Sequence, residues 1–156
     1  MKNDLSMITQ NDIQQLVNSA TLTGFEIDVE DLQLLQWNAG ISTHLPQALP
    51  DNNAAVYIFK WGNEYLKVGK VNSNSNARYQ SQHYNPNSSM SNLSKSILQD
   101  EELRINLNNI SVSEWIKANT TRFNILIPSR LGKNFVHFAE AFFILKCNPR
   151  FENTRA

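Results

Sequence analysis

The chain has 156 residues, of which 41% are hydrophobic, and its 14 basic residues balance its 14 acidic ones. This length and composition predict one domain, or one domain with a small appendage, with enough apolar residues for a core. Cys147 is the only cysteine, which excludes an intramolecular disulfide and a cysteine-based zinc site and fits a reducing compartment. No segment resembles a signal peptide or approaches the roughly 18 apolar residues of a membrane span, so we expect a cytoplasmic protein without a membrane partner.

Charge is unevenly distributed along the chain. Residues 1–50 contain one basic and six acidic residues, whereas residues 51–156 contain 13 basic and 8 acidic ones. The second part alone is therefore a plausible partner for a polyanion such as nucleic acid. Imbalances of this size are also common in proteins without such a partner, and both interpretations stay open.

The first 50 residues are predicted to form a helical N-terminal extension. Residues 9–19 place three aliphatic residues at helical spacing behind a threonine or an asparagine that can cap a helix. Residues 29–37 are predicted to form a second helix, because acidic residues in the first turn precede leucines. Two prolines and an Asn-Asn pair in residues 45–53 indicate a linker to the rest of the chain.

From residue 55 onward the pattern changes to strands. Residues 55–60 and 65–71 are rich in β-branched and aromatic residues, and the Gly-Asn pair between them has turn chemistry, so they predict a β-hairpin. Residues 72–92 are rich in Asn and Ser, with a short helix in their first half, and either line a substrate groove or form a solvated loop. Together with the later elements they predict an α/β (α+β) fold, a small three-stranded antiparallel sheet flanked by helices. The later elements are two helices with capping serines, a third strand and a last apolar helix: residues 91–98, 111–118, 122–127 and 134–146.

Four chemically distinctive pieces follow one another in the second part of the chain. They are Tyr57 in the first strand, Lys67-Val-Gly-Lys in the second, Arg78 after it, and Glu140 in the last helix. In this order they resemble the GIY-YIG nucleases, which place a tyrosine in a first strand and a short Y-I/V-G-K motif in the next, then an arginine, and a glutamate in a later helix. The tail that follows Glu140 is similar to that of the family's DNA-repair members. The resemblance runs from about Val56 to the C-terminus, and we expect residues 51–156 to be the nuclease domain.

The resemblance implies a metal-dependent endonuclease that hydrolyses phosphodiester bonds in nucleic acid, DNA in preference to RNA. Glu140 would hold Mg²⁺ or Mn²⁺, since Mg²⁺ takes one or two carboxylates and completes its shell with water and substrate phosphate. Arg78 would stabilise charge on the scissile phosphate, and Gly69 and Lys70 would contact nucleic acid beside it. The alternatives are a structural ion pair at Glu140 and an exposed helix arginine at Arg78.

The general base is where the chain departs from the family pattern. The family's first tyrosine is thought to help activate the attacking water, which makes Tyr57 the expected base, with a packed strand tyrosine as the alternative. The second tyrosine of the pattern is Lys67 here, which supplies positive charge but no phenol, so the base stays open between Tyr57 and Lys67. His83 follows the arginine one residue later than expected and is either catalytic or a surface histidine. Asn153 matches the family's late asparagine, displaced by one position, and is a further candidate for the site.

Two other functions are compatible with the same sequence. The first is a catalytically silent nucleic-acid-binding module of the same fold, against which the intact Tyr57, Arg78 and Glu140 argue. The second is a phage-defence or regulatory interaction protein whose acidic N-terminal segment binds a partner. The oligomeric state stays open, although one site that cuts one strand would need two copies, a dimer, to cut a duplex.

Overall fold

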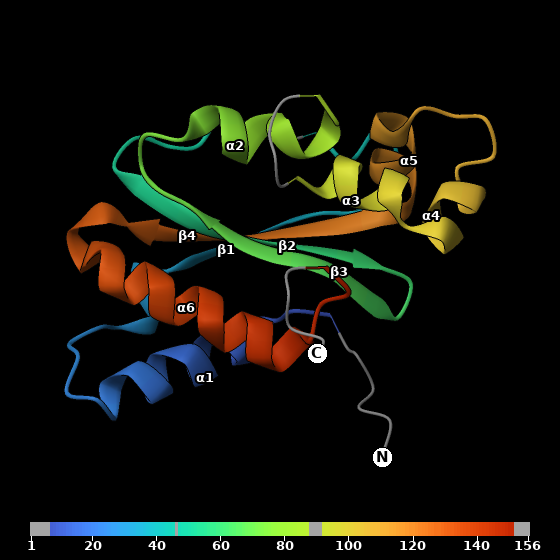
Figure 1. Cartoon of the computed structure of the whole chain (residues 1–156). Helices are drawn as coiled ribbons and strands as arrows, with labels where there is room; N and C mark the ends of the chain where they lie inside the picture. The colour runs from blue at the N-terminus through green and yellow to red at the C-terminus, as the bar shows by residue number, and fades with distance from the viewer. Residues whose placement is uncertain (1–6, 46, 88–91, 152–156) are drawn as a thin grey trace, which may run out of the picture.

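A four-stranded antiparallel sheet runs through the middle of the structure (Figure 1). The computed structural model describes residues 7–45, 47–87 and 92–151. The four strands are, in chain order, β1 (Gln33–Trp37), β2 (Asn53–Trp61), β3 (Glu64–Val71) and β4 (Thr120–Pro128). Their order across the sheet is β1-β4-β2-β3. β1 and β3 are therefore the edge strands, and β4, the last strand in the chain, lies between β1 and β2. The α+β class expected from the sequence is thereby confirmed.

Helices cover both faces of the sheet, which gives the structure three layers (Figure 1). One face carries α1 (Gln10–Thr21) and α6 (Gly132–Cys147). Within the described ranges, none of the helices combines the length and the apolarity that crossing a membrane requires. The other face carries four shorter helices: α2 (Asn76–Gln80), α3 (Leu93–Gln99), α4 (Glu101–Asn106) and α5 (Val112–Asn119). Three short 3-10 turns are η1 (Val29–Asp31), η2 (Gln82–Tyr84) and η3 (Ser129–Leu131).

Alternation along β2 creates two separate hydrophobic cores. Val56 and Ile58 lie in the core beneath α1 and α6, whereas Tyr57 and Phe59 lie in the core beneath the shorter helices. Successive side chains of a strand point to opposite faces of the sheet, so a strand covered on both faces needs apolar residues at nearly every position. β2 meets that requirement, and its side chains are buried from Ala54 through Lys60.

Most predicted elements are confirmed by the structure. The hairpin, the third strand and the first and last helices lie within two residues of their predicted bounds. The backbone N–H of Thr9 donates to the Asp12 carboxylate at 2.7 Å, which satisfies an amide before the first turn of α1. Asn148 stops α6 in the left-handed conformation, with φ at 45°, directly before Pro149. The short helix α4 was not predicted.

Two expectations about the N-terminal region are wrong. The sheet has four strands rather than three, because residues 29–37 do not form a helix. Their acidic start forms only the single turn η1, and the following five residues form β1, which pairs with β4 from Gln33↔Leu126 to Trp37↔Arg122. Leu34 packs against one core and Leu35 against the other. Leucines in this spacing are compatible with either a helix or a strand. Backbone pairing with β4 stabilises the strand.

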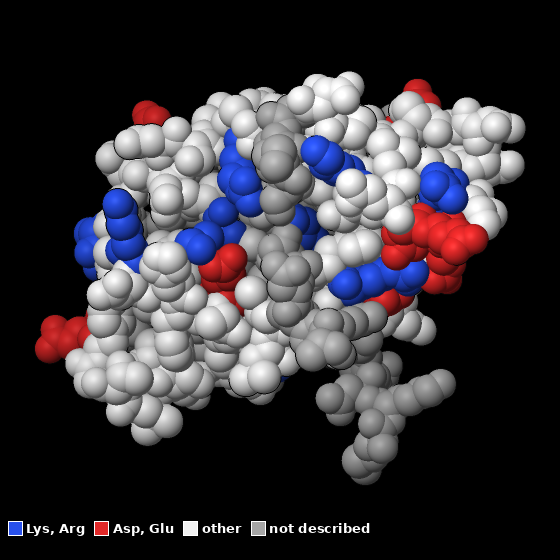
Figure 2. All heavy atoms as spheres, viewed as in Figure 1, with Lys and Arg blue, Asp and Glu red and all other residues white. Residues whose placement is uncertain are grey.

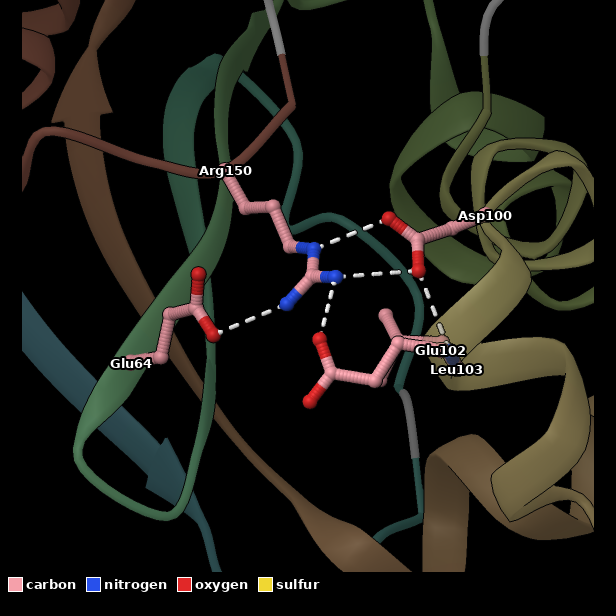
Figure 3. A network of polar contacts seen from close by, with 5 residues as sticks. All are labelled: Glu64, Asp100, Glu102, Leu103 and Arg150. Carbon is pink, nitrogen blue, oxygen red and sulfur yellow. Dashed lines mark hydrogen bonds and ion pairs between the residues drawn. The ribbon is translucent and has the colours of Figure 1, made fainter.

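The segment after α6 folds back onto the edge strand β3. The backbone N–H of Arg150 donates to the carbonyl of Tyr65, and that of Phe151 donates to Leu66, both at 2.9 Å. The Arg150 guanidinium reaches three carboxylates at once (Figure 3). It binds Asp100 through two nitrogens at 2.9 and 3.0 Å, Glu102 at 2.6 Å and Glu64 at 3.1 Å. This cluster ties the C-terminal segment to the hairpin and to the start of α4.

We predict that Arg150→Met lowers the free energy of unfolding by about 1–2 kcal/mol, because it removes a bidentate, charge-assisted contact and two further ion pairs from one cluster. Methionine keeps the apolar stem and removes only the charged group. The measurement is urea unfolding, with Arg104→Met, an exposed arginine of α4, as the matched control. Equal stability of the two variants would mean that the cluster contributes nothing.

Candidate active site

A cleft of about 250 Å³ opens at the edge of the sheet, where β3 ends between α2 and α6. In Figure 2 basic atoms surround a single acidic group in the middle of this face. Five of the residues expected from the sequence meet here, although they come from β2, β3, α2 and α6. The lining residues are Tyr57, Gly69, Lys70, Val71, Asn72, Ser75, Arg78 and Glu140.

Gly69 lets the side chain of Tyr57 reach the cleft. The two residues are direct partners across β2 and β3, and both face the layer of short helices. A Cβ atom at position 69 would lie 2.2 Å from the Tyr57 Oη, much closer than any real contact. The phenol therefore extends across the edge strand over a position that only glycine can occupy without displacing it. The packing of Tyr57 therefore explains why a glycine stands at this position of the strand, even without a bound substrate.

The Tyr57 hydroxyl faces a cation but stays protonated near neutral pH. Burial raises the pKa of Tyr57 above its ordinary value, and the positive charges of Arg78 and Arg122 oppose that rise. The Arg78 guanidinium donates a long hydrogen bond of 3.5 Å to the Tyr57 Oη. A phenol in this setting orients a neighbouring water, and removal of its proton requires additional positive charge.

Glu140 enters the cleft from the opposite face of the sheet and pairs with Lys70. The Lys70 ammonium donates to the Glu140 Oε2 at 2.7 Å, and both side chains are partly exposed. Arg78, the other cation among the lining residues, contacts Tyr57. The ion pair occupies one carboxylate oxygen.

The donor set of the cleft fits one hydrated Mg²⁺ better than a metal held by protein alone. The described residues contain no group of three or more His, Cys, Asp or Glu side chains that could hold a metal ion. Mg²⁺ usually keeps several waters and binds through one or two carboxylates together with substrate phosphates. Glu140 is the one carboxylate among the lining residues, so it would be the protein ligand, in competition with Lys70.

Lys67 lies behind the cleft and does not line it. Its side chain is fully buried, with an exposed fraction of 0%, and it stands opposite Phe59 across the hairpin. Burial, with a contribution from the charge of Arg78, lowers the pKa of Lys67 to about 8, and the charge of Glu140 opposes this change. A lysine in this position exchanges its proton close to neutral pH, unlike an exposed one.

His83 is buried against Tyr57, and the alternative of a surface histidine is wrong. Its exposed fraction is 1%, and its ring lies 4.2 Å from that of Tyr57, centroid to centroid. Neither ring nitrogen has a hydrogen-bond partner among the described residues. Burial lowers the pKa of His83 well below its ordinary value, and the charges of Arg122 and Lys67 add to this, so the imidazole is neutral. Asn153, the other late candidate, lies outside the described residues.

The sequence analysis missed Arg122, a fully buried arginine next to this site. Its guanidinium donates to the Asn124 Oδ1 at 3.0 Å, to the Tyr84 Oη at 3.2 Å and to the Tyr79 carbonyl at 2.5 Å. Aromatic rings surround it, and the nearest are those of Tyr79 and Phe59 at 5.0 and 5.1 Å from its central carbon. The sequence pattern that could have revealed Arg122 is the alternation of residues along β4, which places Arg122 and Asn124 on the same face of the sheet.

Comparisons with protein-family models, with curated proteins and with solved structures found no match. The assignment of the site therefore depends on the residues of this chain and on their geometry.

We predict that Gly69→Ala lowers the free energy of unfolding by about 1–3 kcal/mol, the usual cost of overpacking, because the new methyl group would collide with the Tyr57 ring. The same substitution in a Tyr57→Ala background should cost much less, since the colliding ring is gone. Urea unfolding of the four proteins of this double-mutant cycle measures the coupling. Additive effects of the two substitutions would contradict the close approach.

We predict that burial of Lys67 makes stability rise with pH between about 8 and 10.5, the folded and ordinary pKa values of this lysine. In that window the unfolded chain binds more protons than the folded chain, so the free energy of unfolding increases with pH. Below about pH 8 the full cost of the buried charge is present. The measurement is the stability difference between the wild type and Lys67→Met at several pH values. A difference that stays constant up to about pH 10 would rule out a lowered pKa.

Proposed function

We propose that the chain is a metal-dependent endonuclease that hydrolyses phosphodiester bonds in nucleic acid, with DNA favoured over RNA. The observation that carries the proposal is the meeting of Tyr57, Arg78 and Glu140 in one cleft. These residues lie far apart in the sequence, and their order along the chain is the one that the resemblance implies. Their meeting in one small polar cleft is what joint action on a phosphodiester requires.

The roles of the cleft residues follow from their charges. Arg78 has no carboxylate partner among the described residues, so its guanidinium is available to a phosphate oxygen and to the negative charge that develops there during cleavage. Glu140 would bind Mg²⁺ or Mn²⁺, which when present lowers the pKa of bound water and neutralises phosphate charge. Lys70 would move from Glu140 to the substrate when the metal binds. A phosphate group then replaces the carboxylate as the partner of this lysine.

Tyr57 and Lys67 are the two candidates for accepting the proton from the attacking water. Tyr57 is the only one of them that lines the cleft, so its hydroxyl is placed to contact and orient the water. Its raised pKa disfavours the phenolate, whereas the lowered pKa of Lys67 gives that residue a neutral fraction near neutral pH. In the proposed mechanism Tyr57 orients the water, and the neutral form of Lys67 behind it takes up the proton that the water loses.

A catalytically silent nucleic-acid-binding module is the second candidate, and the ion pair of the cleft favours it. Lys70 and Glu140 form an ion pair with one another, as two residues of a purely structural contact would. A binding protein that engages partners through its acidic N-terminal segment has less support. Asp12 of that segment pairs with Lys146 of α6, and Asp31 pairs with Arg130, so these two charges are used within the chain.

We predict that Glu140→Gln abolishes metal-dependent cleavage and leaves nucleic-acid binding largely intact, because it keeps the shape of the side chain and removes its charge. The assay follows plasmid DNA, single-stranded DNA and RNA with Mg²⁺, with Mn²⁺ and with EDTA. His137→Gln is the matched control, since this exposed residue lies one turn earlier in α6. Cleavage by Glu140→Gln at the wild-type rate would remove this residue from the mechanism. Binding without cleavage by the wild type would select the silent module.

A further inference from the structure

A second hollow of about 150 Å³ adjoins the cleft, and Asn72 lines both. The hollow lies where the loop after β3, the end of β4 and the beginning of α6 meet. A hydrogen bond of 2.8 Å from the Ser129 N–H to the Asn52 carbonyl ties the end of β4 to the residue before β2. The two hollows are therefore neighbours on this side of the molecule, with Asn72 in the lining of both. The residues that line the second hollow are Ala54, Asn72, Ser73, Ser129, Gly132, Lys133 and Val136.

The polar side chains of the second hollow are those that commonly contact phosphate. Ser73 and Ser129 offer hydroxyl groups, Asn72 offers an amide, and Lys133 offers an ammonium group. No carboxylate lines the hollow. The set therefore suits an anion and offers little to a cation.

Each of the two hollows contains one cation that lacks a carboxylate partner among the described residues. In the cleft it is Arg78, and in the second hollow it is Lys133, which is exposed. Other basic residues nearby are neutralised within the chain, as the pairs of Lys70 with Glu140 and of Arg130 with Asp31 show. Figure 2 shows basic atoms both in the middle of this face and over the beginning of α6.

We propose that the second hollow binds a backbone phosphate adjacent to the scissile one, with Lys133 as its cation and Ser73 and Ser129 as hydroxyl donors. The nucleic-acid strand then runs from Arg78 past Asn72 to Lys133. This inference rests on the proposed function for the identity of the strand, but it concerns binding and not cleavage. The second hollow thus defines the path of the strand beyond the cleft.

The test measures how the affinity for a fluorescent DNA oligonucleotide depends on salt, in EDTA so that no cleavage occurs. Lys133→Ala should bind more weakly at low salt and should reduce the slope of log K against log salt by about 0.7 for single strands or about 0.9 for a duplex, the loss expected for one phosphate contact. Arg104→Ala, an exposed arginine of α4 at the other end of the molecule, should leave the slope unchanged (Figure 1). An unchanged slope for Lys133→Ala overturns the subsite.

Neutral methylphosphonate linkages, introduced one at a time into the oligonucleotide, locate the contact. One position next to the scissile linkage should weaken binding of the wild type and have no further effect on Lys133→Ala. Equal losses in both proteins at every position overturn the assignment of Lys133, whatever the outcome of the cleavage assay. A position-specific loss without cleavage by the wild type supports the subsite and rejects the enzyme. A wild type that binds no nucleic acid overturns both proposals.

Discussion

A buried guanidinium that has no carboxylate partner among the described residues is the constraint on which much of this structure depends. Arg122 of β4 is satisfied by neutral acceptors, and two of these, the Tyr79 carbonyl and the Tyr84 hydroxyl, belong to α2 and η2. These bonds hold the layer of short helices against the sheet. Since α2 also contains Arg78, the contacts of Arg122 fix the distance between Arg78 and Tyr57 across that layer. Replacement of this arginine would leave several buried acceptors without donors at once.

The same charge adds to the effect of burial on the protonation of its surroundings. The pKa of His44 is lowered to about 4, first by burial and also by Arg122, and His44 remains a neutral bridge between the Thr120 carbonyl and the Tyr84 hydroxyl. His83 is likewise kept neutral. A positive interior that contains neutral imidazoles and a lysine with a lowered pKa favours anions at its opening, which is the cleft. The field there comes from the interior as well as from surface residues.

The sequence was most informative where chemistry and local pattern coincide. Tyr57 and Gly69 were placed correctly because alternating strands and a turn fix their register within a few residues. The ion pair of Lys70 with Glu140 could not be predicted, since it joins positions 70 residues apart and depends on how α6 crosses the edge of the sheet. Arg122 was missed for a similar reason: its partners come from the opposite layer, and a strand arginine has no motif of its own. The strand β1 was mistaken for a helix because its leucine spacing fits both structures, and only its pairing with β4 distinguishes them.

The C-terminal segment has a consequence for solubility. An edge strand with unpaired N–H and carbonyl groups is a template on which another chain can add a strand, and proteins block such edges to avoid aggregation. Here Arg150 and Phe151 occupy the backbone of Tyr65 and Leu66, and the rest of β3 carries Gly69 and Lys70, which disfavour strand addition. Part of the open edge is also the wall of the cleft. The stretch of β3 backbone that lines the cleft is thus one that a substrate would cover, and release of the C-terminal segment on mild heating would expose a longer edge to which another chain could add a strand.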